Sequence, residues 1–408
     1  MFASEIRSFA LAPERLTTRI KPVVAIEIGS TKIACVVGQS RSQPFSALDG
    51  RTSARPWDLL GAGVAPYAEP SASYPCEPAL IAQALEQALA QAHLTQPIDR
   101  AIVCLSHPHL VHKRLTVQIE LAQEPVTVQR RHLARLRAQA LGQALGLDQD
   151  ALACDAIDYA GNGFSGVRQP HGLMTMRLAG TFHVVAMPIA LRRAVLAALE
   201  QAGLDVDRFL YSLQALAAAL IQTTSPAGGS RLMVIDLGGC SIDLGLVERG
   251  RLIHAQTLPW GGMAVVEAIA GKGGVSRQAA SALAAKGTSQ SDPQIELLLD
   301  EYLAKLEKAL AQFLHGHARP ELCVVVGRGA LMDGLLERLE GFLGMKTVLG
   351  RSRLTASLGD LSTQLQLGAA AGAIELACHG AQPPSRSQPT NLIERVLQRA
   401  QFLLTEYF

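Results

Sequence analysis

The sequence predicts an α/β protein of two lobes, with a small α/β unit inserted beside the first lobe and an amphipathic helix at the C-terminus. Each half of the chain opens with two apolar, β-branched runs that flank a glycine-containing turn, a pattern typical of a β-hairpin. This internal repeat indicates a duplicated fold with a cleft between its halves. The 408 residues, 49% of them hydrophobic, are enough for two or three domains with sizeable cores.

The composition of the chain indicates which classes of partner and which cellular compartment are expected. A formal net charge of +2 argues against nucleic acid as a partner, because phosphate binding needs a concentrated basic face. No apolar run reaches the roughly 18 residues that span a bilayer, and residues 1–22 lack the apolar core of a secretory signal. The seven cysteines form no Cys-x-x-Cys pair, which favours a reduced, cytosolic protein.

The first lobe is predicted at residues 23–98 and 177–222, and the inserted unit at residues 99–176. Apolar periodicity separates the strands from the helices in both parts. The expected strands are Val23–Ile28, Ile33–Gly38, Ala101–Leu105, Leu110–Leu121 and Thr181–Ala186; the expected helices are Glu77–His93, Val126–Leu145, Leu191–Ala202 and Leu213–Gln222; residues 39–58 and Asp155–Pro170 are expected to be loops.

The second lobe is predicted at residues 223–377, with a short helical subdomain at about 261–317. Its elements are expected to be the strands Leu232–Asp236, Ile242–Glu248, Arg251–Leu258, Leu322–Val326 and Thr347–Leu349, and the helices 263–286, 293–314, Leu335–Leu343 and Leu367–Ala377. Residues 378–391 are rich in Pro, Ser and Gln and read as a linker.

Two glycine turns have the composition of phosphate-binding loops. In each, an acidic residue ends a buried strand, and glycines allow backbone N–H groups to approach a phosphate while hydroxyls add donors. Carboxylates at these turns can hold Mg²⁺ through water. The candidate phosphate contacts are Gly29, Ser30, Thr31 and Lys32 in the first turn and Gly238, Gly239, Cys240 and Ser241 in the second; the candidate Mg²⁺ residues are Glu27, Asp236 and Asp243.

A third turn follows the strand at Leu322–Val326. Gly327, Arg328 and Gly329 lead from this strand toward a helix, an arrangement that can cover the adenine and ribose of a nucleotide. Either hairpin alone is also compatible with an ordinary turn, and strand–glycine–helix turns are common in α/β proteins. The occurrence of all three turns in one chain therefore supports the prediction of a nucleotide-binding site.

In this order, the three turns resemble the two phosphate motifs and the adenosine motif of the actin/Hsp70/sugar-kinase ATPase superfamily. Residues 212–222 and 361–372 resemble its two connecting helices. The resemblance implies a two-lobed actin-like ATPase fold that binds ATP and Mg²⁺ in the cleft. No Ser/His/Asp or Cys/His arrangement has catalytic spacing, so no catalytic residue is assigned, and the chain is expected to be at most a weak ATPase.

Mid-chain features resemble one branch of this superfamily, the FtsA family of bacterial cell-division proteins. The similar stretches are Asp158–Gly161, Gly166–Leu173, Phe182–Val185 and Ala198–Val206, and the insertion at 99–176 lies where that family carries its own subdomain. The resemblance implies an adaptor that forms actin-like homopolymers, anchors FtsZ and the Z ring, and meets other divisome proteins. Its place would be the cytoplasmic side of the inner cell membrane, at the division septum.

The C-terminal residues 392–408 are predicted to form an amphipathic, membrane-targeting helix. Asn391 and Glu394 have the spacing of a capping box, and polar residues occupy the face opposite the apolar one. Such a helix can lie in the bilayer interface among membrane lipids, although a helix docked on its own core has the same pattern. The residues on the apolar face are Ile393, Val396, Leu397, Ala400, Phe402, Leu403, Leu404, Tyr407 and Phe408.

The chain departs from the family pattern in the cleft and beside it. Glu27 stands where Asp is usual, Cys240 and Arg328 stand where Gly is usual, and the ribose-contacting Glu and Lys fall at Ser281 and Ala284. These changes weaken the case for tight ATP binding. Residues 286–300 are also shorter than the excursion that the family uses toward FtsZ. Two alternatives follow, namely a type IV pilus-assembly platform protein and a small-molecule kinase of the same superfamily.

Two other patterns are interpreted as structural. Residues 161–166 match Gly-x-Gly-x-x-Gly, but Pro170 and His171 follow where a dinucleotide site needs a helix. His107, His109 and His112 lie close together without a Cys or acidic neighbour, so a solvated strand and turn is expected there rather than a metal site.

Overall fold

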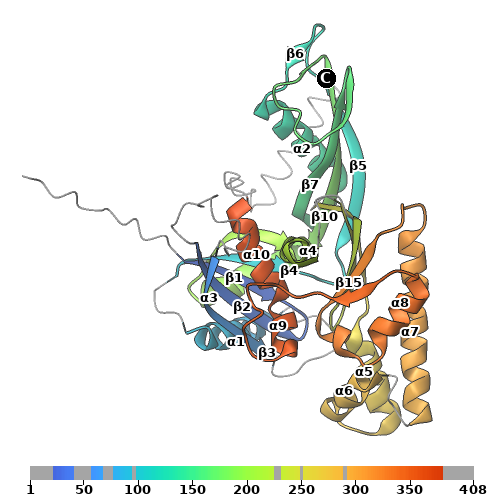
Figure 1. The fold of residues 1–408 in the computed structure, drawn as a ribbon. Coiled ribbons are helices and arrows are strands. Elements are labelled where there is room, and N and C mark those ends of the chain that lie inside the picture. Colours follow the sequence, from blue (N-terminus) through green and yellow to red (C-terminus); the bar gives the residue numbers. More distant parts are fainter. Residues whose placement is uncertain are drawn as a thin grey trace, which may run out of the picture.

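The computed structural model describes residues 22–40, 57–67, 77–93, 98–224, 231–248, 251–287 and 292–379. Figure 1 shows two sheet-containing lobes side by side and a third, elongated unit that rises from them. The predicted amphipathic helix at 392–408 and most of the predicted linker at 378–391 lie outside the described residues.

The first lobe is built on a five-stranded sheet of order β11-β4-β1-β2-β3. The strands β1, β2 and β3 form an antiparallel meander, and β4 and β11 run parallel to β1. The turn between β1 and β2 is as tight as the glycine pattern predicts, because Ile28 pairs directly with Ile33. The strands are β1 (Val23–Ile28), β2 (Lys32–Ser40), β3 (Trp57–Pro66), β4 (Arg100–Leu105) and β11 (Asp205–Tyr211).

The second lobe repeats this topology strand for strand. Its sheet has the order β14-β13-β12-β15-β16, again three antiparallel strands followed by two parallel ones. Leu237 pairs with Ile242 at the hairpin that corresponds to the first one. The predicted duplication is therefore confirmed. The strands are β12 (Arg231–Leu237), β13 (Ile242–Glu248), β14 (Arg251–Leu258), β15 (Leu322–Val326) and β16 (Thr347–Leu349).

Helices cover both faces of the first sheet. Cys35 of β2 pairs with Gly63 of β3, and α1 packs on the face of the sheet to which Gly63 belongs. Gly38 of β2 lies on the opposite face and contacts Ile374 of α10. The helices α1 and α10 therefore lie on opposite faces of the sheet, and α3 packs beside α1. Their bounds are α1 (Pro78–Gln91), α3 (Ile189–Gln201), α4 (Ser212–Thr224), α9 (Leu361–Gln366) and α10 (Gly368–His379).

The second lobe carries a helical subdomain with a core of its own. One helix was predicted over 263–286, but the structure breaks it at Gly274, which has a φ of +59° and ends α5 in the left-handed region. Ser276 then caps α6 by accepting a hydrogen bond from the N–H of Ala279. The helices are α5 (Gly262–Gly273), α6 (Arg277–Ala285), α7 (Pro293–Leu314) and α8 (Leu335–Leu343).

The inserted unit is a four-stranded antiparallel sheet of order β5-β10-β7-β8, with α2 packed on it. Asp155–Pro170 was predicted to be a loop, and this prediction is wrong. Residues 161–163 instead form the turn of the β7–β8 hairpin, with a φ of +89° at Gly163. The bounds are β5 (Val111–Glu120), β6 (Val126–Thr127), α2 (Arg130–Ala144), β7 (Gln149–Gly161), β8 (Phe164–Val167), β9 (Met174–Thr175) and β10 (Arg177–Pro188).

Three further boundaries differ from prediction. The helix expected over Val126–Leu145 begins only at Arg130, because Val126 and Thr127 pair with β9. The strand β3 begins inside the expected loop at 39–58, and the strand β11 was not predicted. Each correction adds a strand that is held by a partner remote in sequence.

The two connecting helices α4 and α10 join the lobes. They pack on each other, and α4 also contacts strands of both large sheets (Figure 1). Gly372 allows this close crossing, because a Cβ atom at this position would clash with the carbonyl group of Ala215. The lobes therefore meet at a contact that tolerates only the smallest side chain.

Replacing Gly372 by Ala should destabilise the protein by about 1–3 kcal/mol, the usual result of overpacking a tight core contact. Gly341 on α8 provides the matched control, since a Cβ atom there would meet open space. Gly341→Ala should be neutral or stabilising by about 0.5–1 kcal/mol, because alanine costs less backbone entropy in a helix. Urea unfolding followed by circular dichroism measures both changes. Equal stabilities of the two variants would contradict the tight-crossing interpretation.

Candidate functional site

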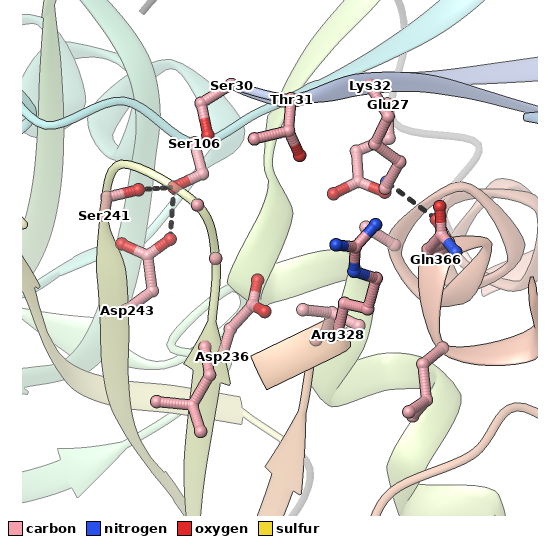
Figure 2. Close-up of a pocket in the computed structure, with 18 residues that line it drawn as sticks. Glu27, Ser30, Thr31, Lys32, Ser106, Asp236, Ser241, Asp243, Arg328 and Gln366 are labelled. Carbon is pink, nitrogen blue, oxygen red and sulfur yellow. Dashed lines mark hydrogen bonds and ion pairs between the residues drawn. The ribbon is translucent and has the colours of Figure 1, made fainter. Parts of the chain in front are cut away.

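The three glycine turns meet in a cleft between the lobes (Figure 2). Nine of the eleven predicted nucleotide-contacting residues line this cleft, and so do the three predicted Mg²⁺ residues. Of the other two, Cys240 is buried, with 4% of its surface exposed, and Gly329 packs against Leu237. The lining residues are Glu27, Gly29, Ser30, Thr31, Lys32, Ser106, Leu216, Asp236, Leu237, Gly238, Gly239, Ser241, Asp243, Gly327, Arg328, Leu365, Gln366 and Ala369.

The first turn places the ammonium group of Lys32 in the lining of the cleft. The backbone N–H of Gly29 donates to the carbonyl oxygen of Lys32 at 3.0 Å, which closes the turn. The Lys32 ammonium group donates to Glu27 Oε2 at 2.7 Å and to the carbonyl oxygen of Gln366 at 2.8 Å. Lys32 therefore ties the first turn to α9 and neutralises one of the three cleft carboxylates.

The second turn lies directly against the first. The backbone N–H of Cys240 donates to Ser30 Oγ at 3.0 Å. A Cβ atom on Gly239 would lie 2.5 Å from Thr31 Cγ2 and 2.9 Å from Ser30 Oγ, so the two turns leave no room for a side chain here. The turn also holds the start of α5, because its carbonyl groups at Gly238 and Gly239 accept hydrogen bonds from the first N–H groups of that helix.

The third turn packs on the strand end that carries Asp236. Gly327 has a φ of +80°, and a Cβ atom there would lie 2.6 Å from Asp236 Oδ1, so both backbone and space require glycine. Arg328 follows it, opens a 3₁₀ turn and donates from Nη2 to Ser281 Oγ on α6 at 3.2 Å. Figure 2 shows the guanidinium group of Arg328 in the cleft, between Asp236 and Glu27.

Asp236 is the electrostatically costly member of the cleft. Burial raises the pKa of its carboxyl to about 8, and the charges of Asp243 and Glu27 add to this shift, while Lys32 opposes it. Burial and the neighbouring carboxylates thus favour the protonated form of this group. A nearby divalent cation would favour its ionised form. Among the residues that the structure describes, no group of three or more His, Cys, Asp and Glu side chains is placed to hold a metal ion directly.

Asp243 is engaged by three hydroxyl groups. Tyr211 donates to its Oδ1 at 2.9 Å, and Thr257 and Ser106 also donate to the carboxylate. Burial raises the pKa of Asp243, and these hydrogen bonds partly offset that effect. Asp243 thus lines the cleft and contacts, through Ser106, the Ser241 hydroxyl of the second turn.

Sequence reasoning missed Ser106, Gln366, Tyr211 and Thr257. For Ser106 a signal existed, because it follows the parallel strand β4, and the carboxyl ends of parallel strands are where α/β proteins place their sites. Gln366 contributes a backbone carbonyl to Lys32, which no residue type reveals. Thr257 pairs directly with Asp243 across the hairpin of β13 and β14, whereas Tyr211 on β11 reaches Asp243 from the other lobe.

The segment after β4 forms the predicted turn and strand, and His109 is exposed, but His107 and His112 are not solvated as expected. His107 is only 4% exposed, and burial lowers its pKa to about 4. His112 is half-buried, and its Nε2 lies 2.9 Å from Thr257 Oγ1. The prediction failed because this segment passes between the first lobe and the inserted unit, where other elements cover it.

Asp236→Asn should remove a pH dependence of stability. The folded-state pKa of about 8 exceeds the ordinary value of 3.8, so the folded protein binds more protons between these values and loses stability as the pH rises through them. The Asn variant lacks this loss and should melt roughly 2 °C or more above the natural protein at pH 8, with little difference at pH 4. Thermal unfolding at both pH values tests this. Parallel losses of stability in the two proteins would contradict it.

No model of a known protein family matches the chain. The cell division protein FtsA of Escherichia coli K12 is 23% identical to it over 252 residues, which are 61% of this chain and 56% of the relative. FtsA of Pseudomonas aeruginosa is 24% identical over 252 residues, or 61% of this chain and 57% of the relative. The chain thus spans little more than half the length of the curated relatives that it matches.

A solved structure shares the fold over nearly the whole chain. The PilM–PilN type IV pilus biogenesis complex contains a chain that superposes with a TM-score of 0.63 at 18% identity, covering 88% of this chain and 99% of that one. This likeness and the duplicated topology confirm the predicted two-lobed actin-like fold with an inserted unit. In sequence the chain is therefore similar to FtsA proteins over 61% of its length, and it shares its fold with a chain of the PilM–PilN complex.

Proposed function

We propose that this chain binds ATP with Mg²⁺ in the interlobe cleft and acts as a self-assembling adaptor in bacterial cell division. One observation carries the nucleotide part: a glycine turn from each lobe faces the same cleft, with carboxylates at the ends of both strands. In this proposal Gly29–Thr31 and Gly238–Ser241 contact the phosphates, and Gly327 and Arg328 border the base. Glu27 and Asp236 would hold Mg²⁺ through water.

The donors in the cleft fit a polyphosphate, but several are already engaged. Backbone N–H groups, hydroxyls and the side chains of Lys32 and Arg328 suit an anionic ligand. The N–H of Cys240 is bonded to Ser30, and Lys32 is bonded to Glu27 and Gln366. A bound nucleotide must exchange with these contacts, so its affinity should be modest, and ATPase activity should be weak at most.

The adaptor part rests on similarity to FtsA over 61% of the chain. It assigns four kinds of contact: with FtsZ, with further copies of this chain, with other divisome proteins and with lipids of the inner membrane at the septum. The lipid contact would use the apolar face from Ile393 to Phe408, which lies outside the described residues. No helix in the described part of the chain is long and apolar enough to cross a membrane.

A pilus-assembly platform is the second candidate. The likeness to the PilM–PilN chain covers 99% of that chain, whereas the similarity to FtsA covers 56% of the relative. Because the structural likeness concerns the fold alone, the identity of the partner must separate the two functions.

ATP binding should depend on Mg²⁺ through Asp236. In a titration with a fluorescent ATP analogue, Mg²⁺ should tighten binding to the natural protein, and Asp236→Asn should lose roughly 10-fold or more of the Mg²⁺-dependent affinity. Asp360→Asn, which removes the capping carboxylate of α9 outside the cleft lining, is the control and should bind like the natural protein. Identical affinities for all three proteins, with and without Mg²⁺, would contradict the proposed Mg²⁺–ATP site.

Liposome co-sedimentation tests the adaptor. The full chain should pellet with vesicles that contain anionic lipid and carry FtsZ down with it, whereas a chain ending at Pro384 should stay in solution because it lacks the apolar face. A cytoplasmic peptide of a PilN-type protein is offered in a parallel sample. Pelleting of the peptide but not of FtsZ would favour the pilus-assembly function, and a full chain that never pellets would exclude the membrane contact.

A further inference from the structure

A continuous chain of polar contacts runs from the second glycine turn into the inserted unit. Ser241 Oγ lies 3.2 Å from Ser106 Oγ, and Ser106 donates to Asp243. Thr257 donates to the same carboxylate, and its Oγ1 lies 2.9 Å from His112 Nε2. Figure 2 shows the first part of this chain beside the cleft. It ends at His183, whose Nε2 lies 3.3 Å from His112 Nδ1.

We call these six residues, together with Tyr211, the polar joint, because they come from all three parts of the molecule. Ser241, Asp243 and Thr257 belong to the second lobe, Ser106 and Tyr211 to the first, and His112 and His183 to the inserted unit. The two histidines lie on β5 and β10, which are the strands that enter and leave this unit. The polar joint therefore sits where the inserted unit is attached.

The hydrogen bonds of the polar joint have one direction. Thr257 uses its hydroxyl hydrogen on Asp243, so it accepts from His112 Nε2–H. His112 Nδ1 is then an acceptor and receives the Nε2–H of His183. The remaining nitrogen, His183 Nδ1, is buried and has no hydrogen-bond partner; in this assignment it carries no hydrogen, so no N–H group is left unpaired there. Every donor along the histidine branch points toward Asp243.

The burial and packing of these residues disfavour other arrangements of their hydrogen bonds. Tyr211, Asp243 and His183 are each at most 2% exposed. The ring of His112 stacks on that of His183 with centroids 5.4 Å apart and an interplanar angle of 11°. A change of partner at one member must therefore be accommodated by its neighbours, because buried polar groups are costly to leave unpaired.

We propose that the polar joint transmits the binding of an anion in the cleft to the inserted unit. Ser241 is both a lining residue of the cleft and the first member of the joint. An anion that accepts the Ser241 hydroxyl hydrogen takes it away from Ser106, and Ser106, Asp243, Thr257 and His112 readjust in turn. The proposal rests on the proposed function, in which that anion is the polyphosphate of a nucleotide.

Hydrogen exchange of the full chain, with and without Mg²⁺ and ATP, tests the proposal. In the natural protein the nucleotide should change exchange in residues 111–117 and 182–186 by about five-fold or more, the lower end of typical coupling between sites. Thr257→Val removes the hydroxyl that connects His112 to Asp243. This variant should bind ATP with natural affinity and lose the change in both strands.

Thr181→Val is the matched control. Thr181 pairs with Thr116 across the same two strands, with their hydroxyl oxygens 3.2 Å apart, but neither residue belongs to the polar joint. This variant should respond to the nucleotide like the natural protein. A response that persists in Thr257→Val, or that is absent from the natural protein although ATP binds, overturns the proposal and leaves the proposed function standing.

Failure of ATP to bind at all counts against the proposed function, and the joint is then tested without nucleotide. Ser106→Ala removes the link between Ser241 and Asp243. Relative to Thr181→Val, it should change exchange in the same two segments by about five-fold or more. Unchanged exchange in this variant, with native circular dichroism, would overturn the proposal.

Discussion

The direct contact between two glycine turns is the constraint on which the rest of the structure depends. Ser30 accepts the N–H of Cys240 across the interlobe boundary, and Gly239 has no space for a Cβ atom beside Thr31. Because each turn closes a hairpin of its own lobe, this contact fixes the distance between the two sheets. A second close contact occurs at Gly372, where α4 and α10 cross and a Cβ atom would clash with the carbonyl group of Ala215. The cleft exists because both contacts exclude side chains.

Within that frame the cleft brings three carboxyl groups together, those of Glu27, Asp236 and Asp243. Lys32 satisfies Glu27, whereas Asp236 has its pKa raised to about 8 by burial and by its acidic neighbours. Such an arrangement lowers the stability of the folded protein at neutral pH, and proteins commonly retain such a cost at functional sites.

The sequence was sufficient for features that depend on local pattern and insufficient for features that depend on packing. Apolar runs around Gly29 and Gly238 specify tight hairpins, and the duplicated topology follows from them. By contrast, β3 carries Gly61 and Gly63 because the backbone of α1 packs directly on them, and these glycines remove the usual signal of a strand. His112 reads as solvated until β14 covers it. Most of the cleft was predictable because its chemistry lies in the turns, which supply Ser241 and Asp243. Ser106, His112 and His183 were not predicted as members of the polar joint, because they reach it only through contacts between distant segments.

The composition of the polar joint also determines what it can respond to. Burial lowers the pKa of His112 to about 3 and that of His183 to about 4. Nearby basic groups add to both shifts: His183 and His254 for His112, and His254 and Arg114 for His183. Both rings are therefore neutral above these values, so the hydrogen-bond direction does not change across the physiological pH range. Neutral hydroxyl and imidazole groups are also little affected by salt. The members that border the cleft are Ser106, Ser241 and Asp243, so a joint of this composition responds to what occupies the cleft rather than to the surrounding medium.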